Sequence, residues 1–329
     1  MLEIIVISVI KVIVVFAVLL TACAYMTLLE RRVVARFQTR LGPIETGPSG
    51  LLQPVADLVK LLFKEDIIPG HVDKPIYLLA PLASFIPATL AFVVIPFGST
   101  INLFGHEINL VLSDLNVGIL YIFAVTSLGV YGIILSGWSS NSKYSMLGAI
   151  RSSAQMISYE ISMGLAIVGV VLIAGSLNLN DIVEAQKGVW FVFLQPVGFL
   201  IYLICGIAET NRAPFDLPEC ESELVAGYHT EYSAMKFGMF FVGEYANMIT
   251  IGAVATTLYF GGWIGPTGSP ILSIFWFCIK VFCFMFLYLW LRATTPRFRY
   301  DQLMNFGWKI LLPIALLNVV ITAAVVMLV

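Results

Sequence analysis

Long apolar stretches alternate with polar connections along the whole chain. Eight of these stretches approach the ~20 residues that an α-helix needs to cross the hydrocarbon core of a bilayer. They occupy residues 4–29, 76–98, 117–137, 152–174, 190–208, 237–260, 271–291 and 308–328. Because a segment in lipid must satisfy its own backbone hydrogen bonds, we expect each stretch to form a helix. The pattern therefore predicts an all-α integral membrane protein, with residues 1–329 forming one bundle of about eight transmembrane helices.

A further segment has a helical pattern but is too short to cross a membrane. Between residues 51 and 64, apolar side chains recur at positions 51, 52, 55, 58, 59 and 62, while positions 53, 57, 60 and 64 are polar. This spacing predicts a cytoplasmic-side amphipathic helix in the plane of the membrane interface. Two roles stay open for it. It is either an anchor with solvated Asp57 and Lys60, or the lip of a lateral opening lined by Arg36, Arg40 and Asp57.

Composition agrees with a membrane protein and excludes an ordinary soluble domain. Hydrophobic residues make up 59% of the chain and charged residues 12%, whereas charged residues are about 25% of typical soluble domains. Most of the 18 lysines and arginines fall in the first, third, fifth and seventh connections between the apolar stretches. Since positive charge marks the loops that stay in the cytoplasm, we expect both termini on the non-cytoplasmic side.

Acidic residues are concentrated in one part of the chain. The stretch from Glu209 to Glu244 contains seven of the 20 acidic residues, and only Arg212 and Lys236 oppose them. Ionisable groups beside or inside an apolar layer are costly and by default mark a path for ions or protons. We therefore predict a cytoplasmic loop at 209–236 that couples to protons. Its candidate residues, with Arg212 as the counter-charge, are Glu209, Asp216, Glu219, Glu221 and Glu223.

Two glutamates lie within predicted spans. Glu160 is nine residues beyond Arg151, or roughly 13 Å along a helix, and Glu244 is eight residues beyond Lys236, or roughly 12 Å. Both spans start on the cytoplasmic side, so the two carboxyl groups are expected at similar depths. A single buried acid is explained by a structural hydrogen bond, for instance to a nearby serine such as Ser158 or Ser162. Two acids at matched depth favour a functional role in proton coupling.

The sequence lacks the signatures of a catalytic or metal site. Its five cysteines include no C-x-x-C pair, and it has no phosphate-binding glycine loop and no nucleophile elbow. His106 and Glu107 resemble the start of a zinc-binding helix, but no second histidine follows four residues after the first. We expect no complete catalytic site, no metal site and no nucleic-acid partner for this chain alone.

Five segments resemble one family of membrane subunits. They follow one another along essentially the whole chain: ERRVVARFQTRLGP, LLFKEDIIP, GWSSNSKYSMLGAIRSSAQMISYE, AETNRAPFDLPECESELVAGYHTEYSAMKFGMFFVGEY and LRATTPRFRYDQLMNFGWK. Together they resemble the H subunit of bacterial respiratory complex I, the proton-pumping NADH:quinone oxidoreductase, whose mitochondrial counterpart is NADH dehydrogenase subunit 1. The resemblance implies a multi-pass translocase subunit in the bacterial cell inner (cytoplasmic) membrane.

The resemblance also implies roles for particular residues. Such subunits lie where the peripheral arm meets the membrane arm, and they help to enclose a chamber for ubiquinone or menaquinone. Carried onto this chain, the chamber mouth would lie near Arg36, Arg40, Val55 and Asp57. The acids of the loop at 209–236, followed by Glu160 and Glu244, would form the route from the chamber to the pump.

Partners and cofactors follow from the same resemblance. FMN and the iron–sulfur clusters are expected in partner subunits, so this chain would bind no cofactor of its own and would meet the quinone as a substrate. The peripheral-arm partners would carry the terminal iron–sulfur cluster and the site for the quinone headgroup. Other membrane-arm subunits and the lipid bilayer would surround the chain.

Three alternative functions remain open at this stage. The chain is also compatible with the homologous membrane subunit of an energy-converting hydrogenase, although the long basic first connection favours a quinone user. A stand-alone cation/proton antiporter would need no redox partner. A purely structural anchor for a peripheral arm would not need Glu160 and Glu244 inside the membrane.

Overall fold

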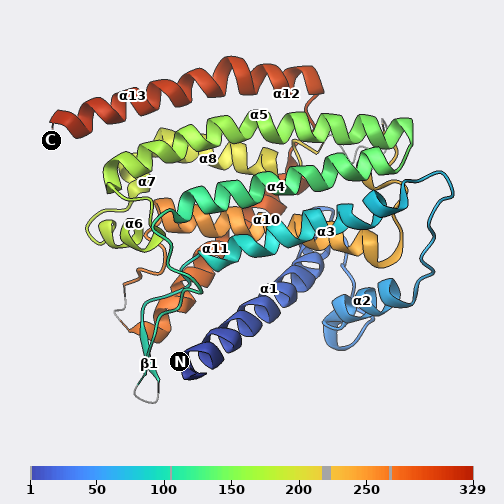
Figure 1. The fold of residues 1–329 in the computed structure, drawn as a ribbon, viewed down its shortest axis with the longest axis horizontal. Helices are drawn as coiled ribbons and strands as arrows, with labels where there is room; N and C mark the ends of the chain where they lie inside the picture. The colour runs from blue at the N-terminus through green and yellow to red at the C-terminus, as the bar shows by residue number, and fades with distance from the viewer. Residues whose placement is uncertain (1, 104–105, 217–223, 267–268, 329) are drawn as a thin grey trace.

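The structure is a computed structural model that describes residues 2–103, 106–216, 224–266 and 269–328. Among these residues, seven helices are long and apolar enough to cross a membrane, and most of them follow the long axis of the molecule in Figure 1. They are α1 (Leu2–Phe37), α3 (Lys74–Leu90), α4 (Gly118–Ser139), α5 (Lys143–Ala174), α10 (Ala234–Tyr259), α11 (Pro270–Thr294) and α13 (Leu312–Leu328), which continues from α12 (Tyr300–Phe306) through the π-helical turn η4 (Gly307–Leu311). The predicted all-α membrane class is confirmed.

Shorter elements connect the long helices. They are α2 (Gln53–Phe63), α6 (Leu179–Ala185), α7 (Phe191–Leu194), α8 (Pro196–Glu209) and the 3₁₀ turns η1 (Pro48–Gly50), η2 (Ala91–Val93) and η3 (Gly227–His229). Two short strands, β1 (Ile101–Leu103) and β2 (His106–Ile108), form an antiparallel hairpin. The amphipathic helix predicted at 51–64 is present as α2, and its apolar residues Val55, Leu58, Val59 and Leu62 are exposed.

The fifth predicted span, residues 190–208, is broken into two helices. The four-residue α7 ends at Leu194, and the 14-residue α8 begins at Pro196. Gln195 leaves the helical region of backbone space (φ −129°, ψ 55°) because the ring of a proline disfavours helical backbone at the preceding residue. The segment is predominantly apolar in sequence, but the proline after Gln195 interrupts the helix.

Two other predicted boundaries shift for local reasons. The predicted span 76–98 is α-helical only to Leu90 and is followed by the turn η2. Pro96 disfavours helical backbone at Ile95, so the helix does not continue to residue 98. The predicted span 152–174 starts nine residues earlier, at Lys143. Its polar first turns are stabilised by packing against η3, where the hydroxyl of Ser145 donates to the carbonyl of Tyr228 at 3.1 Å.

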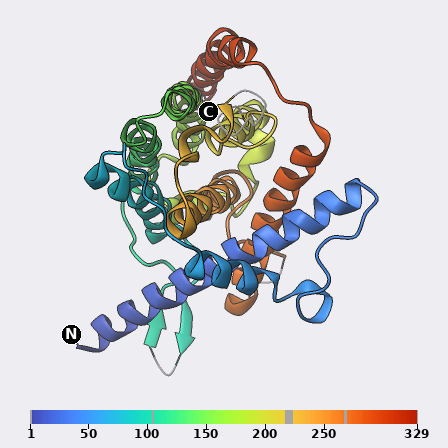
Figure 2. The same cartoon turned by 90° about the vertical axis from the view of Figure 1, so that its right-hand side faces the viewer.

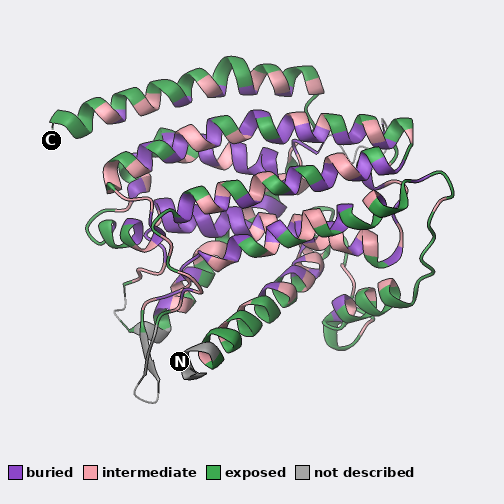
Figure 3. Cartoon of the chain, in the orientation of Figure 1, coloured by how far each residue is buried: buried purple, intermediate pink, exposed green. Residues whose placement is uncertain are grey.

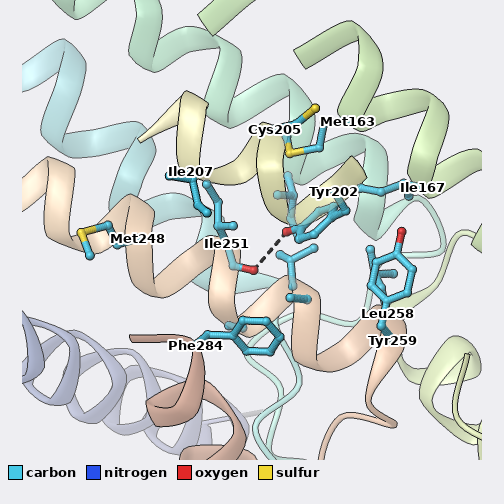
Figure 4. Close-up of a cluster of buried hydrophobic side chains, with 14 of the residues drawn as sticks. Met163, Ile167, Tyr202, Cys205, Ile207, Met248, Ile251, Leu258, Tyr259 and Phe284 are labelled. Carbon is cyan, nitrogen blue, oxygen red and sulfur yellow. Dashed lines mark hydrogen bonds between the residues drawn. The ribbon is translucent and has the colours of Figure 1, made fainter. Parts of the chain in front are cut away.

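Helix α10 lies inside the bundle, and α1 and α13 lie at its edges. Figure 2, an end-on view, places α10 (orange) in the interior, α1 (blue) along one side and α13 (red) on the other. Figure 3 shows the same contrast as exposed residues on α1 and α13 and buried ones on α10. The apolar core between α5, α8 and α10 includes Tyr202, whose hydroxyl donates to the carbonyl of Ile251 at 3.0 Å (Figure 4).

The two ends of the bundle differ in what they carry. Both termini lie toward the left-hand end of Figure 1, with α6 and the β-hairpin, whereas α2 lies toward the opposite end. Among the described residues, the shorter apolar helix α8 lies in the bundle beside the seven long helices. The connection from α1 to α3, with its many basic residues, is therefore at the end away from the termini.

Candidate functional site

A cavity of about 760 Å³ lies between α1, α2 and α10. Its volume falls in the range of about 300–1,000 Å³ that is usual for small-molecule sites. Much of its wall is apolar, with Leu20 and Cys23 from α1, Leu58 and Leu61 from α2, and Phe85 from α3. Charged residues share the wall, and these are Glu30, Arg31, Asp57, Lys60, Lys64, Arg212 and Arg292. The cavity therefore offers an apolar volume that is edged by charge.

A cluster of buried ion pairs forms part of this wall. Arg212 Nη1 lies 3.1 Å from Glu30 Oε2, and Arg212 Nε lies 2.5 Å from Glu244 Oε1. Arg292 Nη1 pairs with the other oxygen of Glu30. The Tyr245 hydroxyl donates to Glu30 Oε2 at 2.8 Å, and the Arg212 guanidinium lies 4.5 Å from the centre of the Tyr245 ring. We call these five residues, Glu30, Arg212, Glu244, Tyr245 and Arg292, the arginine cluster.

Because the arginine cluster is buried, each of its charges depends on the opposite charges beside it. The side chains of Arg212, Glu30 and Glu244 are exposed by only 6%, 12% and 10%. Removing one partner from such a buried pair typically costs about 3–5 kcal/mol, because the remaining charge is left without compensation. Two carboxylates and two guanidiniums balance each other here, so a new charge in the cavity would disturb the balance directly.

A second group of acids lies apart from these arginines. Ser127 of α4 hydrogen-bonds the carboxyl group of Glu160 on α5. Glu209 ends α8, is buried, and interacts electrostatically with Glu160. A small cavity of about 20 Å³ borders Glu209, which is enough space for a single water molecule. Within the described part of the chain, Glu209 Oε2 has no hydrogen-bond partner.

The turn between α8 and the acidic loop is held at several points. Gln155 of α5 donates from its side-chain amide to the carbonyls of Ala208 and Phe215 at 2.8 and 2.9 Å. Asp216 Oδ2 lies 3.1 Å from Arg297 Nη2. Because Arg212 belongs to the same turn, its position relative to α1 and α10 is determined by packing against α5 and by the connection after α11.

Comparison with known proteins agrees with this architecture. The model of the NADH dehydrogenase family matches residues 10–323. The chain belongs to the NADH dehydrogenase family. It is 56% identical to an H subunit of NADH-quinone oxidoreductase from Geobacter sulfurreducens, over 96% of this chain and 95% of that protein. It is also 56% identical to the H subunit from Protochlamydia amoebophila, over 92% of each chain. Identity to the H subunit from Thermomicrobium roseum is 54%, over 94% of this chain and 92% of that protein.

The cavity of this family member includes one of the four predicted chamber residues. Asp57 lines the cavity, and its Oδ2 lies 2.8 Å from Arg31 Nη1. Arg36, Arg40 and Val55 are exposed and do not belong to the cavity wall. A place for these three residues at a chamber built with partner subunits stays a prediction.

The predicted coupling residues fall into two separate places. Arg212 and Glu244 belong to the arginine cluster, whereas Glu160 and Glu209 form the second group. Asp216 pairs with Arg297. The predicted acids Glu219, Glu221 and Glu223 lie outside the described residues, so their relation to Arg212 stays a prediction.

Three residues of the arginine cluster, Glu30, Tyr245 and Arg292, were not singled out from the sequence. Glu30 lies at the end of the first apolar run, and Arg292 lies at the end of the seventh. Each resembles an ordinary loop charge, although an acid so close to an apolar run is a usable signal.

The structural explanation considered for Glu160 is also corrected. Its serine donor is Ser127 on the neighbouring helix, while Ser158 donates to the carbonyl of Ala154.

His229 is the one histidine between residues 209 and 244, and it lies outside the spans in η3. It is buried against the rings of Tyr228 and Phe237. Burial lowers its pKa from 6.5 to about 4, because the charged imidazolium would lose its hydration. Within the described ranges, no group of three or more His, Cys, Asp or Glu side chains is arranged to hold a metal ion.

Proposed function

We propose that the chain is a membrane subunit of a proton-translocating NADH:quinone oxidoreductase and that its cavity receives the quinone. The relatives are named as H subunits of NADH-quinone oxidoreductase, which favours this function over a hydrogenase component or a stand-alone antiporter. The observation that carries the proposal is the contact between the arginine cluster and the cavity. An apolar wall suits a long hydrocarbon tail, and the buried charges at its edge respond to the negative charge that develops on the headgroup when it is reduced.

The entrance is the part of the cavity bordered by α1 and α2. Leu58 and Leu61 of α2 face the cavity together with Leu20 and Cys23 of α1. Both helices also present exposed apolar residues, which suits contact with lipid. A hydrophobic substrate therefore enters sideways from the bilayer without crossing water. The electrons come from a redox centre in a partner subunit, because this sequence has no signature of such a centre.

Coupling follows from electrostatics. Negative charge that develops on the bound quinone is attracted by Arg212 and Arg292, which weakens their hold on Glu30 and Glu244. Arg212 lies in the turn that begins directly after Glu209. A shift of that turn changes the environment of Glu209 and of its electrostatic partner Glu160. The two acid groups thereby transmit the redox event into the membrane.

Orientation completes the proposal. The basic connections at the end away from the termini face the cytoplasm, and the peripheral subunits of the complex dock there. Both termini then lie on the non-cytoplasmic side of the bacterial inner membrane. Other membrane subunits and lipid cover the exposed apolar faces of α1 and α13.

The experiment that tests the cavity compares two tryptophan substitutions on α2. Leu58→Trp places a bulky ring in the cavity wall, while Val59→Trp is a matched control because Val59 is outside the wall and similarly exposed, 45% against 49%. We expect Leu58→Trp to lower the rate of quinone reduction by the assembled complex. The loss should be larger for long-tailed than for short-tailed quinones. Equal losses for both tail lengths, or equal losses in both variants, would contradict entry through this cavity.

A further inference from the structure

The hydroxyl group of Ser127 lies between two oxygen acceptors. On its own helix, Ser127 Oγ is 2.8 Å from the carbonyl oxygen of Phe123. On the other side it hydrogen-bonds Oε1 of Glu160, which belongs to α5. The two contacts come from different helices, so Ser127 connects the backbone of α4 to an acid within α5.

The number of hydrogens limits how these contacts are made. A serine hydroxyl has one hydrogen to donate and two lone pairs to accept with. A backbone carbonyl only accepts, and an ionised carboxylate also only accepts. Ser127 therefore cannot donate to Phe123 and to an ionised Glu160 at the same time. Both hydrogen bonds exist together only when Glu160 is protonated and donates its own hydrogen to Ser127 Oγ.

We propose that Ser127 is a positioning residue that stabilises Glu160 in both protonation states by rotating its hydroxyl hydrogen. When Glu160 is ionised, Ser127 donates to Oε1 and releases the Phe123 carbonyl, which still accepts from the hydroxyl of Thr126 at 3.2 Å. When Glu160 gains a proton, its O–H bond points to Ser127 Oγ, and Ser127 donates to Phe123. One proton is added to Glu160 and no covalent bond of Ser127 is broken, while the hydrogen bond between Ser127 and Glu160 reverses its direction.

The surroundings of Glu160 make this arrangement useful. An ionised carboxylate without a donor is expensive in an apolar layer, and so is a buried carboxylic acid without an acceptor. Ser127 lowers both costs, so Glu160 changes its protonation state with a smaller loss of hydrogen bonding.

The inference rests on the proposed function, because it assigns Glu160 a proton to exchange. Its test uses the assembled complex in proteoliposomes and four variants. Ser127→Ala removes the hydroxyl, and Ser127→Thr restores it. Glu160→Gln imitates the protonated form, because its amide donates where the acid would. Ser153→Ala is the matched control, since the Ser153 hydroxyl donates to the carbonyl of Ile150 within its own helix.

Proton pumping and infrared spectroscopy give independent results. We expect Ser127→Ala to slow quinone-driven pumping by roughly threefold to tenfold, the effect of one net hydrogen bond, while Ser127→Thr and Ser153→Ala stay near the unmodified complex. The carbonyl stretching band of protonated Glu160, identified by its loss in Glu160→Gln, should shift in Ser127→Ala. Added to Glu160→Gln, Ser127→Ala should cause no further loss, because the two residues act as one unit.

The possible outcomes separate the inference from the proposed function. The inference would be overturned if Ser127→Ala and Ser153→Ala had the same pumping rate and the same infrared band. It would also be overturned if Ser127→Thr lost as much pumping as Ser127→Ala. Full pumping by Glu160→Gln together with a shifted band in Ser127→Ala would reject the coupling role and retain the hydrogen bond. If Ser127→Ala does not assemble, Ser127→Cys replaces it, since a thiol is a weak donor of similar size.

Discussion

The two acid groups of this protein are stabilised in different ways. In the arginine cluster, the carboxylates of Glu30 and Glu244 lie against guanidinium groups and are almost fully buried. Glu160 instead has a serine hydroxyl as its partner, and Glu209 borders a small cavity. Ion pairing keeps charges in place, whereas a hydroxyl accommodates an acid in either protonation state. Under the proposed function, the first group would respond to charge and the second would exchange protons.

The largest effect is expected when the arginine cluster loses Arg212. Arg212→Met leaves Glu30 and Glu244 buried with less compensating charge, which should destabilise the complex by about 3–5 kcal/mol. Thermal unfolding of the purified complex measures this loss, and quinone reduction should fall with it. Arg299→Met is the control, because the Arg299 side chain is 78% exposed and pairs with Asp301 on the surface at 3.2 Å. It should cost no more than about 1 kcal/mol. Similar losses in the two variants would remove the distinction between buried and surface pairs.

An intermediate effect should distinguish the two glutamates within spans. Glu244→Gln leaves Arg212 short of one partner, so it should lower stability by about 3 kcal/mol as well as slow proton pumping. Glu160→Gln retains a donor for Ser127 and should lower stability by less than about 1 kcal/mol. It should nevertheless slow pumping as strongly as Glu244→Gln does, because it removes the exchangeable proton. The measurements are thermal unfolding and pumping in proteoliposomes. If both variants lose stability equally, the comparison between the two groups is wrong.

A smaller effect near neutral pH is expected from His229, in the segment that joins the two groups. Its pKa in the folded protein, about 4, lies below the 6.5 of an exposed histidine, so the unfolded chain binds the proton more tightly. The contribution of neutral His229 is fully present above pH ~6.5 and is lost as the pH falls toward 4. The loss should be about 1 kcal/mol at pH 6 and about 2 kcal/mol at pH 5.

The variant His229→Phe tests this pH dependence. Phenylalanine fits the surrounding rings of Tyr228 and Phe237 and has no proton to gain. Between pH 7 and pH 5, the free energy of unfolding should decline less for the His229→Phe complex than for the unmodified complex. Parallel curves would mean that His229 is already hydrated in the folded protein.

The sequence alone was sufficient for the membrane class, for the approximate position of most spans and for the amphipathic helix α2. These features depend on hydrophobicity and on the 3.6-residue period, which are local properties of the chain. Where a predicted helix was wrong, the apolar composition of the segment had been given more weight than the local effect of a proline. Pro196 breaks the fifth span, although residues 190–208 are predominantly apolar.

The tertiary structure decided which acids share a partner. Glu30 and Arg212 are 182 positions apart in the chain, yet they pair because α1 and the turn after α8 are packed beside α10. Ser127 and Glu160 are 33 positions apart and meet where α4 packs on α5. Periodicity predicts which residues share one face of a helix, but it does not say which faces of different helices meet. That choice depends on packing across the whole bundle, and for this protein it determines which acids form ion pairs and which have a hydroxyl group as their partner.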